Sequence, residues 1–320
     1  MPAAVLCLAA AGCAKEESSS MGADARAYLD VWLAKKHPGV QPNADGLYIL
    51  SETPGTGDYW DVNRAYNMAE VTIRDMDGVI TSTTDRTLAQ QLGTYSVQNY
   101  YGPIYLAQGT SISFAGVDAL MSGMRIGGSR TAVIPSWLLT TNRYDTEAEY
   151  LANCDNAAHL IYSVTLTGQT DDPSSVENTQ VARYVAEHYP EVTEPSSYTE
   201  DEADGSFWFI SDTTPFEGQT EFARDTTLSR GAKQAGIYDA SKTYEPVFIR
   251  YASSYEDITM TGSSSLINGF KAALALMKWD LQRCTVVFTS AHGYSYSGSG
   301  DAIPSYAPLI FELEIVKYEE

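Results

Sequence analysis

Apolar positions recur with two periods in the last third of the chain. Between residues 266 and 277 they fall every three or four positions, which puts them on one face of a short helix. In the stretches 284–290 and 309–316, Val286 and Phe288, and then Leu309, Phe311, Leu313 and Ile315, recur with period two, as expected for strands that bury one face. The pattern predicts a short helix lying across a curved antiparallel sheet.

The same order of elements occurs twice along the chain. Amphipathic helices are predicted at 25–33 and 181–188, each stopped by a proline shortly after its end and each followed by a strand, at 45–51 and 204–211. Further on, a Gly-x-Tyr-x5-Tyr-x-Pro motif begins at Gly93 and again, with identical spacing, at Gly236. Self-similarity of this kind indicates two copies of one structural unit.

The later parts of the two copies also correspond. Residues 116–124 match 269–277, and the strand predicted at 160–166 matches 309–315. The Asp, Pro and Ser residues of 170–175 are typical of a linker. We therefore expect a helix and first domain in residues 21–170, called repeat one, and a helix and second domain in residues 171–320, called repeat two.

Residues 1–20 are predicted to be a targeting signal and tether. The apolar run ends in Leu8-Ala-Ala-Ala-Gly12-Cys13, which resembles a bacterial lipobox, so Cys13 is the expected lipidation site. A polar stretch follows, Lys15-Glu16-Glu17 and three serines, similar to the surface-export signal of some Gram-negative lipoproteins. The resemblance implies a lipid-anchored protein of the cell envelope, at the outer membrane or cell surface.

Composition narrows the functional classes. The 320 residues are 44% hydrophobic, which favours folded domains. The formal net charge of −21 argues against nucleic acid as a partner. Cys7 belongs to the leader, and Cys154 and Cys284, one in each repeat, are expected to be free thiols. The four histidines, at 37, 159, 188 and 292, lack ligand spacing. We expect no metal and no cofactor.

Two motifs resemble a known family. In repeat two the order is Leu266-Ile267-x-Gly269-Phe270, a helix ending in Met277, a strand, a Tyr-bearing loop, Ile303-Pro304 and Leu309-Ile310-Phe311-x-Leu313-x-Ile315. This order resembles the C-terminal half of FKBP-type peptidyl-prolyl cis-trans isomerases. In repeat one, Gly123-Met124-x-x-Gly127-Gly128-x-Arg130-x-x-x-Ile134-Pro135 is similar to a segment of bacterial FKBPs. The resemblance implies an α+β fold with two FKBP-like domains, each a curved antiparallel sheet wrapped on a short helix.

The resemblance also implies a prolyl-peptide site in repeat two. Phe270 takes the floor of the family's aromatic cup, and the backbone N–H of Ile267 is the donor to a substrate carbonyl. Tyr294 takes the place of a loop tyrosine that donates a hydrogen bond, Phe311 lines the wall, and Asp225 stands where the family has an Asp after a Phe. The alternative for Phe270 and Phe311 is ordinary core packing.

Repeat two lacks part of the family pattern. Thr83 follows Ser51 by 32 positions, whereas Thr226 follows the matching Ser211 by 15, so repeat two is about 17 residues shorter here. The missing piece corresponds to a strand and turn that carry a cup tyrosine in the family. Tyr251 is the candidate replacement in space.

Repeat one retains the strand but has lost the cup. The resemblance puts Val117 at the floor, Val71 at the strand tyrosine and Thr140 at the loop tyrosine, and Tyr162 alone stays aromatic. Because a cup without aromatic side chains binds prolyl peptides poorly, repeat one is predicted to be a scaffold or binding module with little or no isomerase activity.

Three functional classes stay open. The first is an isomerase that acts on exported or surface polypeptides, with any catalysis in repeat two. The second is a chaperone-like, peptide-binding lipoprotein that retains the fold but not the rate. The third is an accessory component of a surface complex, in which Tyr-rich loops such as 95–101 meet a protein partner.

Overall fold

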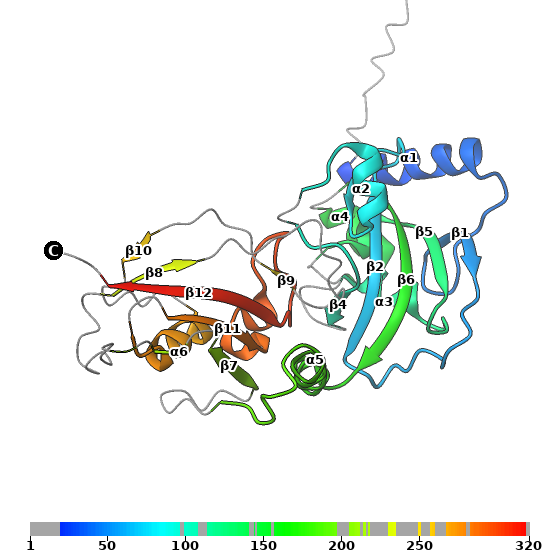
Figure 1. The fold of residues 1–320 in the computed structure, drawn as a ribbon. Coiled ribbons are helices and arrows are strands. Elements are labelled where there is room, and N and C mark those ends of the chain that lie inside the picture. Colours follow the sequence, from blue (N-terminus) through cyan, green and yellow to red (C-terminus); the bar gives the residue numbers. More distant parts are fainter. Residues whose placement is uncertain are drawn as a thin grey trace, which may run out of the picture.

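The protein folds into two β-sheets, one from each half of the sequence (Figure 1). The computed structural model describes residues 20–96, 99–107, 114–140, 144, 146–154, 157–196, 205–211, 214–215, 217, 230–234, 249–250, 257–259, 267–279 and 282–317. Below, the first half means residues 21–170 and the second half residues 171–320. Cys7, Cys13, Asp225 and Tyr251 lie outside the described residues.

The first half begins with helix α1 (Met21–Lys36) and continues into a six-stranded sheet of order β1-β5-β6-β2-β3, with β4 paired to β2. The strands are β1 (Tyr48–Thr53), β2 (Tyr66–Arg74), β3 (Ile80–Thr83), β4 (Ile104–Ala107), β5 (Ser129–Ile134) and β6 (Leu160–Thr170). The other helices are α2 (Arg86–Leu92), α3 (Ala115–Met121), the 3-10 turn η1 (Ser136–Leu138) and α4 (Glu147–Asn153).

The second half has the same plan. Helix α5 (Pro173–His188) comes first, and the sheet has the order β10-β8-β12-β11-β7, with β9 paired in parallel to β12. The strands are β7 (Phe207–Ser211), β8 (Arg230–Gln234), β9 (Ile249–Arg250), β10 (Asp257–Thr259), β11 (Arg283–Phe288) and β12 (Leu309–Lys317). Helix α6 (Asn268–Leu276) and the 3-10 turns η3 (Ser290–His292) and η4 (Ser295–Ser297) complete the described elements.

The last strand of each half lies inside its sheet. β6 pairs with β5 and β2, and β12 pairs with β11 and β8, in each case antiparallel. The five residues of β8 thus take the place that the nine residues of β2 have in the first sheet. This is how the shorter second half forms its sheet. The helix predicted over 266–277 and the strands predicted at 284–290 and 309–316 are confirmed as α6, β11 and β12.

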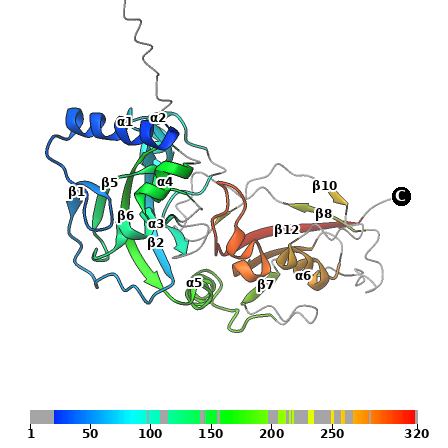
Figure 2. The ribbon, with the colours of Figure 1, turned by 180° about the vertical axis from the view of Figure 1, so that it is seen from behind.

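A helix packs on each face of both sheets, and the alternation of side chains along the strands explains why. In β5, Ala132 and Ile134 face the core beneath α3, whereas Val133 faces the cluster that contains Leu29 and Leu33 of α1. In β11, Phe288 faces the core with α6, whereas Val287 packs with residues of α5. Both views of the ribbon place α5 between the two sheets (Figures 1 and 2).

The linker predicted at 170–175 is wrong. β6 continues to Thr170 and α5 already begins at Pro173. Asp172 caps the helix, because its side chain accepts a hydrogen bond from the N–H of Ser175 at 3.0 Å. Pro173 occupies the first helical turn, where a missing N–H is tolerated. The same residues that suggest a linker therefore start the helix.

Two further features concern the cysteines and the bilayer. Cys154 and Cys284 are free thiols, the latter buried in β11. Among the described helices, none is long and apolar enough to cross a membrane.

Candidate functional site

Four aromatic side chains contact one another in series in the core of the second half. Phe270 of α6 meets Phe311 of β12 edge to face, with ring centroids 5.8 Å apart and planes at 85°. Phe311 lies parallel to Phe288 of β11 at 5.7 Å, and Phe288 in turn stacks on Phe207 of β7 at 6.1 Å. Edge-to-face and offset-stacked pairs at these distances are favourable. This series of ring contacts joins α6 to three strands of the sheet.

The start of α6 fixes the position of Phe270. Ile267 precedes the helix in an extended conformation, and its carbonyl accepts hydrogen bonds from the N–H groups of Phe270 at 3.1 Å and Lys271 at 3.2 Å. Gly269 lets the helix approach the sheet closely, because a Cβ at this position would lie 2.5 Å from the ring of Phe288. Within the part of the chain that the structure describes, the N–H of Ile267 has no hydrogen-bond acceptor.

Tyr294 lies in the turn between η3 and η4 and is half-buried against the same cluster. Its carbonyl accepts hydrogen bonds from the N–H groups of Ser297 and Gly298, both at 3.2 Å. The next residue, Ser295, has a left-handed φ of 53°, and its carbonyl accepts from the N–H of Tyr306, whose φ is 57°. Two non-glycine residues in this region of φ store local strain, as binding loops often do.

The structure thus brings four of the predicted site residues into one cluster: Phe270 and Phe311 within it, and Ile267 and Tyr294 packed against it. Phe270 is 3% exposed and Phe311 is 5% exposed. This burial is compatible with a cup floor covered by other residues and with ordinary core packing. The fifth residue, Asp225, lies outside the described residues.

In the first half, the matching positions are also grouped, but the surroundings are aliphatic. Val71, Val117 and Tyr162 belong to one buried cluster with leucine, methionine and alanine side chains. Burial raises the pKa of the Tyr162 hydroxyl. Thr140 follows the η1 turn and is half-buried. Tyr162 is therefore the aromatic member of a mainly aliphatic buried cluster, and Trp60 and Phe114 pack against this cluster from its partly buried edge.

A buried carboxylate, which the sequence analysis overlooked, holds the loop before Tyr294. Glu177 of α5 is 1% exposed and accepts two hydrogen bonds from Ser290, one from its backbone N–H at 2.6 Å and one from its hydroxyl at 2.7 Å. Burial raises the pKa of Glu177 to about 7, although the two bonds from Ser290 act in the opposite direction. A signal for it exists in the sequence: Glu177 is the polar member of an apolar helical stripe whose other members are Pro173, Val181 and Val185.

More buried polar atoms surround this contact. His292 of η3 is 5% exposed, and its Nε2 lies 3.3 Å from the carbonyl oxygen of Gly205. Its Nδ1 and the hydroxyls of Thr289 and Ser206 have no partner in the described part of the chain. No group of three or more acidic, histidine or cysteine side chains that could hold a metal occurs among the described residues.

The two halves meet through tyrosines. The hydroxyl of Tyr306 donates to that of Tyr66 at 3.0 Å, and both rings lie edge to face with the ring of Tyr105. Beside them, the N–H of Tyr100 donates to the carbonyl of Asp301 at 2.9 Å. Tyr100 also packs against the cluster that contains Phe270 and Phe311. A residue of the first half therefore borders the candidate site of the second.

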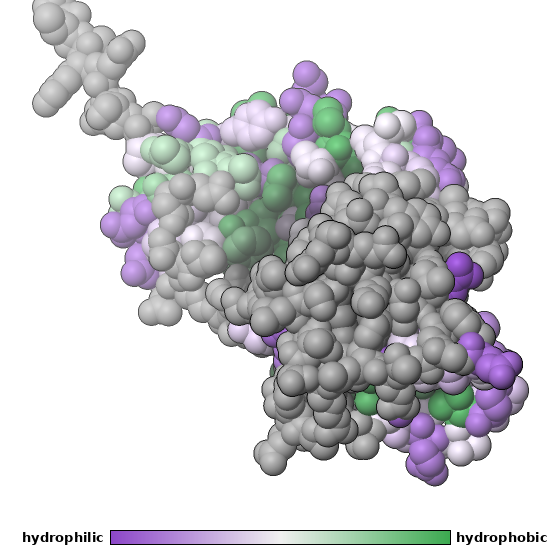
Figure 3. Space-filling model, turned by 60° about the vertical axis from the view of Figure 1, so that its left-hand side comes forward, coloured by the Kyte–Doolittle hydropathy of each residue, from purple (hydrophilic) through white to green (hydrophobic). Residues whose placement is uncertain are grey.

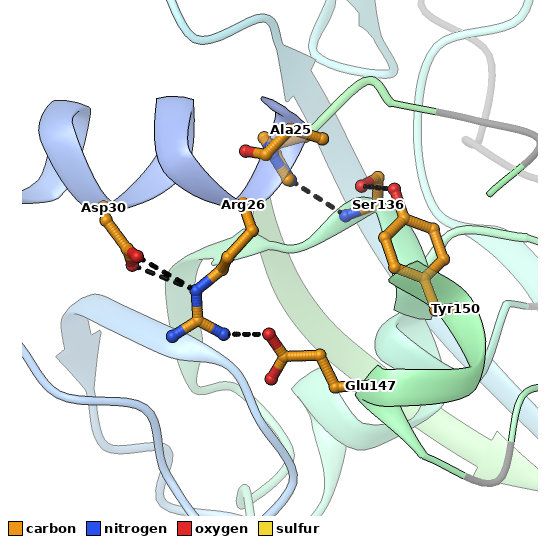
Figure 4. A network of polar contacts seen from close by, with 7 residues as sticks. Ala25, Arg26, Asp30, Ser136, Glu147 and Tyr150 are labelled. Atoms are coloured by element: carbon orange, nitrogen blue, oxygen red, sulfur yellow. Dashed lines mark hydrogen bonds and ion pairs between the residues drawn. The ribbon is translucent and has the colours of Figure 1, made fainter. Parts of the chain in front are cut away.

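A separate polar network ties α1 to the rest of the first half. The N–H of Ser136 donates to Nδ1 of His159 at 3.0 Å, so Nε2 carries the proton and donates to the carbonyl of Ala25 at 2.8 Å. Figure 4 shows Arg26 of α1 reaching Glu147 of α4 while Asp30 faces the same guanidinium. A pocket of about 350 Å³ opens beside α1, lined by residues that include Arg26, Asp30 and Tyr48. The predicted site residues do not line it.

Comparisons with known proteins point to the second half. Residues 242–316 match the family model of FKBP-type peptidyl-prolyl cis-trans isomerases. No curated protein matches the chain. Among solved structures, a peptidyl-prolyl cis-trans isomerase from Pseudomonas syringae pv. tomato is 21% identical and matches with a TM-score of 0.31 over 47% of this chain and 93% of its own. FkpA from Escherichia coli is 16% identical, with a TM-score of 0.30 over 46% of this chain and 58% of its own.

A structure with three FKBP domains, wheat FKBP73, is 14% identical, with a TM-score of 0.24 over 86% of this chain and 95% of its own. Superpositions with TM-scores this low carry no argument. The family match includes α6, the 290–298 loop and β12 up to residue 316. Residues 242–316, a segment of the second half, are therefore similar to an FKBP-type peptidyl-prolyl cis-trans isomerase domain.

Proposed function

We propose that the protein is a peptidyl-prolyl cis-trans isomerase whose catalysis takes place in the second half, on proline-containing segments of exported polypeptides. The observation that carries the proposal is that one cluster holds four of the predicted site residues: Phe270, Phe311, Ile267 and Tyr294. The ring centroids of Phe270 and Phe311 are 5.8 Å apart. All four residues fall in the segment that matches the isomerase family.

The chemistry needs neither a nucleophile nor a metal. Rotation about an X–Pro bond must overcome most of the amide barrier of ~18–20 kcal/mol, and the planar imide is more charge-separated than the twisted transition state. An aromatic cup that removes water from the imide therefore disfavours the planar ground state relative to the twisted one. The N–H of Ile267 and the hydroxyl of Tyr294 are the donors that we assign to substrate carbonyls.

The first half acts as a scaffold or binding module in this proposal. Val71 and Val117 stand at two of the cup positions, and Tyr162 is the aromatic member of their buried cluster, against which Trp60 and Phe114 pack. Each ~1.4 kcal/mol of preference for the transition state corresponds to a tenfold change in rate, so replacing several aromatic contacts by valine removes most of the expected acceleration. The two halves are, in this proposal, tandem FKBP-like domains.

We further propose a lipid-anchored location in the cell envelope, at the outer membrane or cell surface. This rests on Cys13 and the apolar residues before it, and it defines the clients as polypeptides that have crossed the inner membrane. This part is tested by the incorporation of a labelled fatty acid into the protein, which should be lost in a Cys13→Ala variant. A protein that fractionates with soluble material in both forms contradicts it.

The second candidate function is a peptide-binding, non-catalytic lipoprotein, either chaperone-like or part of a surface complex. The observation that favours it is the burial of Phe270 and Phe311, at 3% and 5% exposure, because a working cup presents its floor to the substrate.

The deciding experiment is the prolyl isomerisation of an Ala-Leu-Pro-Phe-type peptide by the full chain, beside a Phe270→Ala, Tyr294→Ala variant. The isomerase proposal expects turnover that the variant loses. Leu120→Ala is the matched control, because it opens a cavity in the core of the first half without touching the site. Peptide binding without turnover in the wild type supports the second candidate, and neither binding nor turnover contradicts both.

A further inference from the structure

We propose that Tyr100, a residue of the first half, forms part of the wall of the prolyl-peptide site of the second half. The inference rests on the proposed function. It makes the site composite: the isomerase segment supplies the floor and the donors, and the neighbouring half supplies an aromatic side chain at the wall.

The position of Tyr100 is the first step of the argument. Tyr100 packs against the cluster that holds Phe270 and Phe311, as do Ile267 and Tyr294. Its N–H donates to the carbonyl of Asp301 at 2.9 Å, and Ala302, which follows Asp301, belongs to the same set of packed residues. The backbone bond therefore attaches Tyr100 to the loop that connects Tyr294 with β12.

The conformation of the segment is the second step. The hydroxyl of Tyr100 donates to the carbonyl of Pro103 at 3.0 Å. Gly102 has a φ of 141°, and a Cβ there would lie 2.8 Å from the Tyr100 hydroxyl oxygen. The chain thus folds back around its own tyrosine and fixes the ring direction. Because the hydroxyl is already bonded, the ring surface is what Tyr100 offers to a peptide.

The third step is what the second half lacks. It has about 17 fewer residues between its first strand and the position of Thr226 than the first half has at the matching place. By resemblance, this is the piece that would carry a wall tyrosine. β8 restores the strand with five residues, Arg230–Gln234, none of which is aromatic. Tyr100 therefore offers an aromatic ring where the described strand β8 carries none.

Tyrosine contacts between the two halves hold Tyr100 beside the site of the second half. Tyr306 bonds to Tyr66 through their hydroxyls at 3.0 Å, and the rings of Tyr66, Tyr105 and Tyr306 contact one another at 5.4 to 6.4 Å. Burial raises the pKa of both Tyr100 and Tyr105, the latter to about 12. Figure 3 shows hydrophobic residues gathered on one face of the molecule.

The test compares Tyr100→Ala, Tyr100→Phe and Tyr105→Ala in the full chain, by the KM for Ala-Leu-Pro-Phe turnover and by direct binding of the same peptide. We expect Tyr100→Ala to raise KM about tenfold, as for the loss of one aromatic contact. Tyr100→Phe should stay within about twofold, because the ring remains. Tyr105→Ala loosens the contact between the halves without removing the wall, so it should change KM less than Tyr100→Ala.

A second readout is made on the wild type and needs only the conservative Tyr100→Phe variant, to assign one resonance. Fluorotyrosine incorporated in the wild type should show a peptide-dependent shift of the Tyr100 resonance, assigned as the one missing in Tyr100→Phe. If the wild type is active but Tyr100→Ala matches it and the resonance does not move, the inference is overturned and the proposed function stands. Higher activity in Tyr100→Ala would mean that the ring covers the site, which also overturns the inference. If the wild type neither binds nor turns over the peptide, both fall.

Discussion

Glu177 and Ser290 are joined by two hydrogen bonds across the boundary between α5 and the loop that leads to Tyr294. The carboxylate accepts from the backbone N–H at 2.6 Å and from the hydroxyl at 2.7 Å. Both residues are almost completely buried. The contact fixes the position of Ser290, where η3 begins. The carbonyl of Ser290 in turn accepts a hydrogen bond from the N–H of Gly293 at 2.8 Å, so the contact also restrains the residue before Tyr294.

Glu177 should make the stability of the protein fall as pH rises. Its pKa is raised from 4.5 to about 7, chiefly by burial, so the folded protein holds the proton more tightly than the unfolded chain. The stabilisation is therefore complete below the unfolded pKa and is lost as pH rises through about 7, by roughly 2 to 3 kcal/mol. Urea unfolding of the wild type between pH 5 and 8 should show this decline, and Glu177→Gln should lack it.

Glu191→Gln is the control for Glu177, because it removes an exposed carboxylate just after the same helix. It should leave the decline in place. The assignment would be contradicted if the difference in free energy of unfolding between the wild type and Glu177→Gln were the same at pH 5 and pH 8, because other titrating groups contribute equally to both proteins.

His159 should give the first half the opposite pH dependence. Ser136 follows β5 as Ser290 follows β11, and its N–H donates to the imidazole Nδ1 of His159 instead of to a carboxylate. Burial lowers the pKa of His159, and the nearby charges of Arg26 and Asp30 oppose each other. A protonated ring would place a second donor against the Ser136 N–H. The stabilisation is therefore present above the ordinary pKa of His and is lost as pH falls.

The measurement is hydrogen exchange of the amides in residues 25–33, corrected for intrinsic rates, at pH 7.5 and pH 5. Protection of α1 should fall at the lower pH, because Nε2 of His159 holds the Ala25 carbonyl of this helix. A His188→Gln variant, which changes an exposed histidine at the end of α5, should show the same fall. Unchanged protection at pH 5 would contradict a role for His159.

The local periodicity of the sequence predicts several of the described elements correctly. The period-two stretches become β11 and β12, and the helical stripe becomes α6. The linker is the error, since Asp172 and Pro173 are compatible both with a loop and with a helix start, and only the side-chain bond to Ser175 decides between them. The short strand β8 was not predicted, because its pairing with β12 depends on distant residues and not on an alternating pattern of its own.

The candidate site is predictable only in part, for a related reason. Motif spacing identifies Ile267, Phe270, Tyr294 and Phe311, which all come from one continuous stretch. Tyr100 and Glu177 lie far from that stretch in the sequence. Tyr100 reaches it through the packing of the first half on the second, and Glu177 reaches it through the packing of α5 on the loop at Ser290. No local pattern encodes such a contact, although a glutamate in an apolar stripe is a usable signal.

Glycine at the start of α3 and α6 should be essential for stability. A Cβ at Gly269 would lie 2.5 to 2.7 Å from three ring atoms of Phe288, and one at Gly116 would overlap the Cγ2 atom of Ile134. Gly269→Ala and Gly116→Ala should each lower the free energy of unfolding by about 1 to 3 kcal/mol through overpacking. Lys271→Ala on the half-exposed side of α6 is the control, and an unchanged Tm for Gly269→Ala would show that the helix shifts freely.

Arg130 should be the residue that holds α3 on the first sheet. Its Nη1 donates to the carbonyls of Leu120 at 2.8 Å and Ser122 at 2.9 Å, at the end of the helix, and its Nη2 donates to Glu52 of β1 at 2.8 Å. The side chain is only 10% exposed. In β11 the corresponding position is the buried Cys284, so the second half holds α6 differently: Gln282 accepts from the N–H of Lys278 and donates to Ser211.

Arg130→Lys should therefore destabilise the protein although it keeps the charge. One ammonium group cannot reproduce the planar fork that reaches two carbonyls and a carboxylate, and the loss of charged hydrogen bonds to buried carbonyls is expected to lower the free energy of unfolding by about 2 kcal/mol. Glu52→Gln separates the ion pair from the helix contacts. Because Glu52 is 44% exposed, its change should stay below about 1 kcal/mol. If urea unfolding ranks Glu52→Gln as the more damaging change, the ion pair and not the helix end is what Arg130 supports.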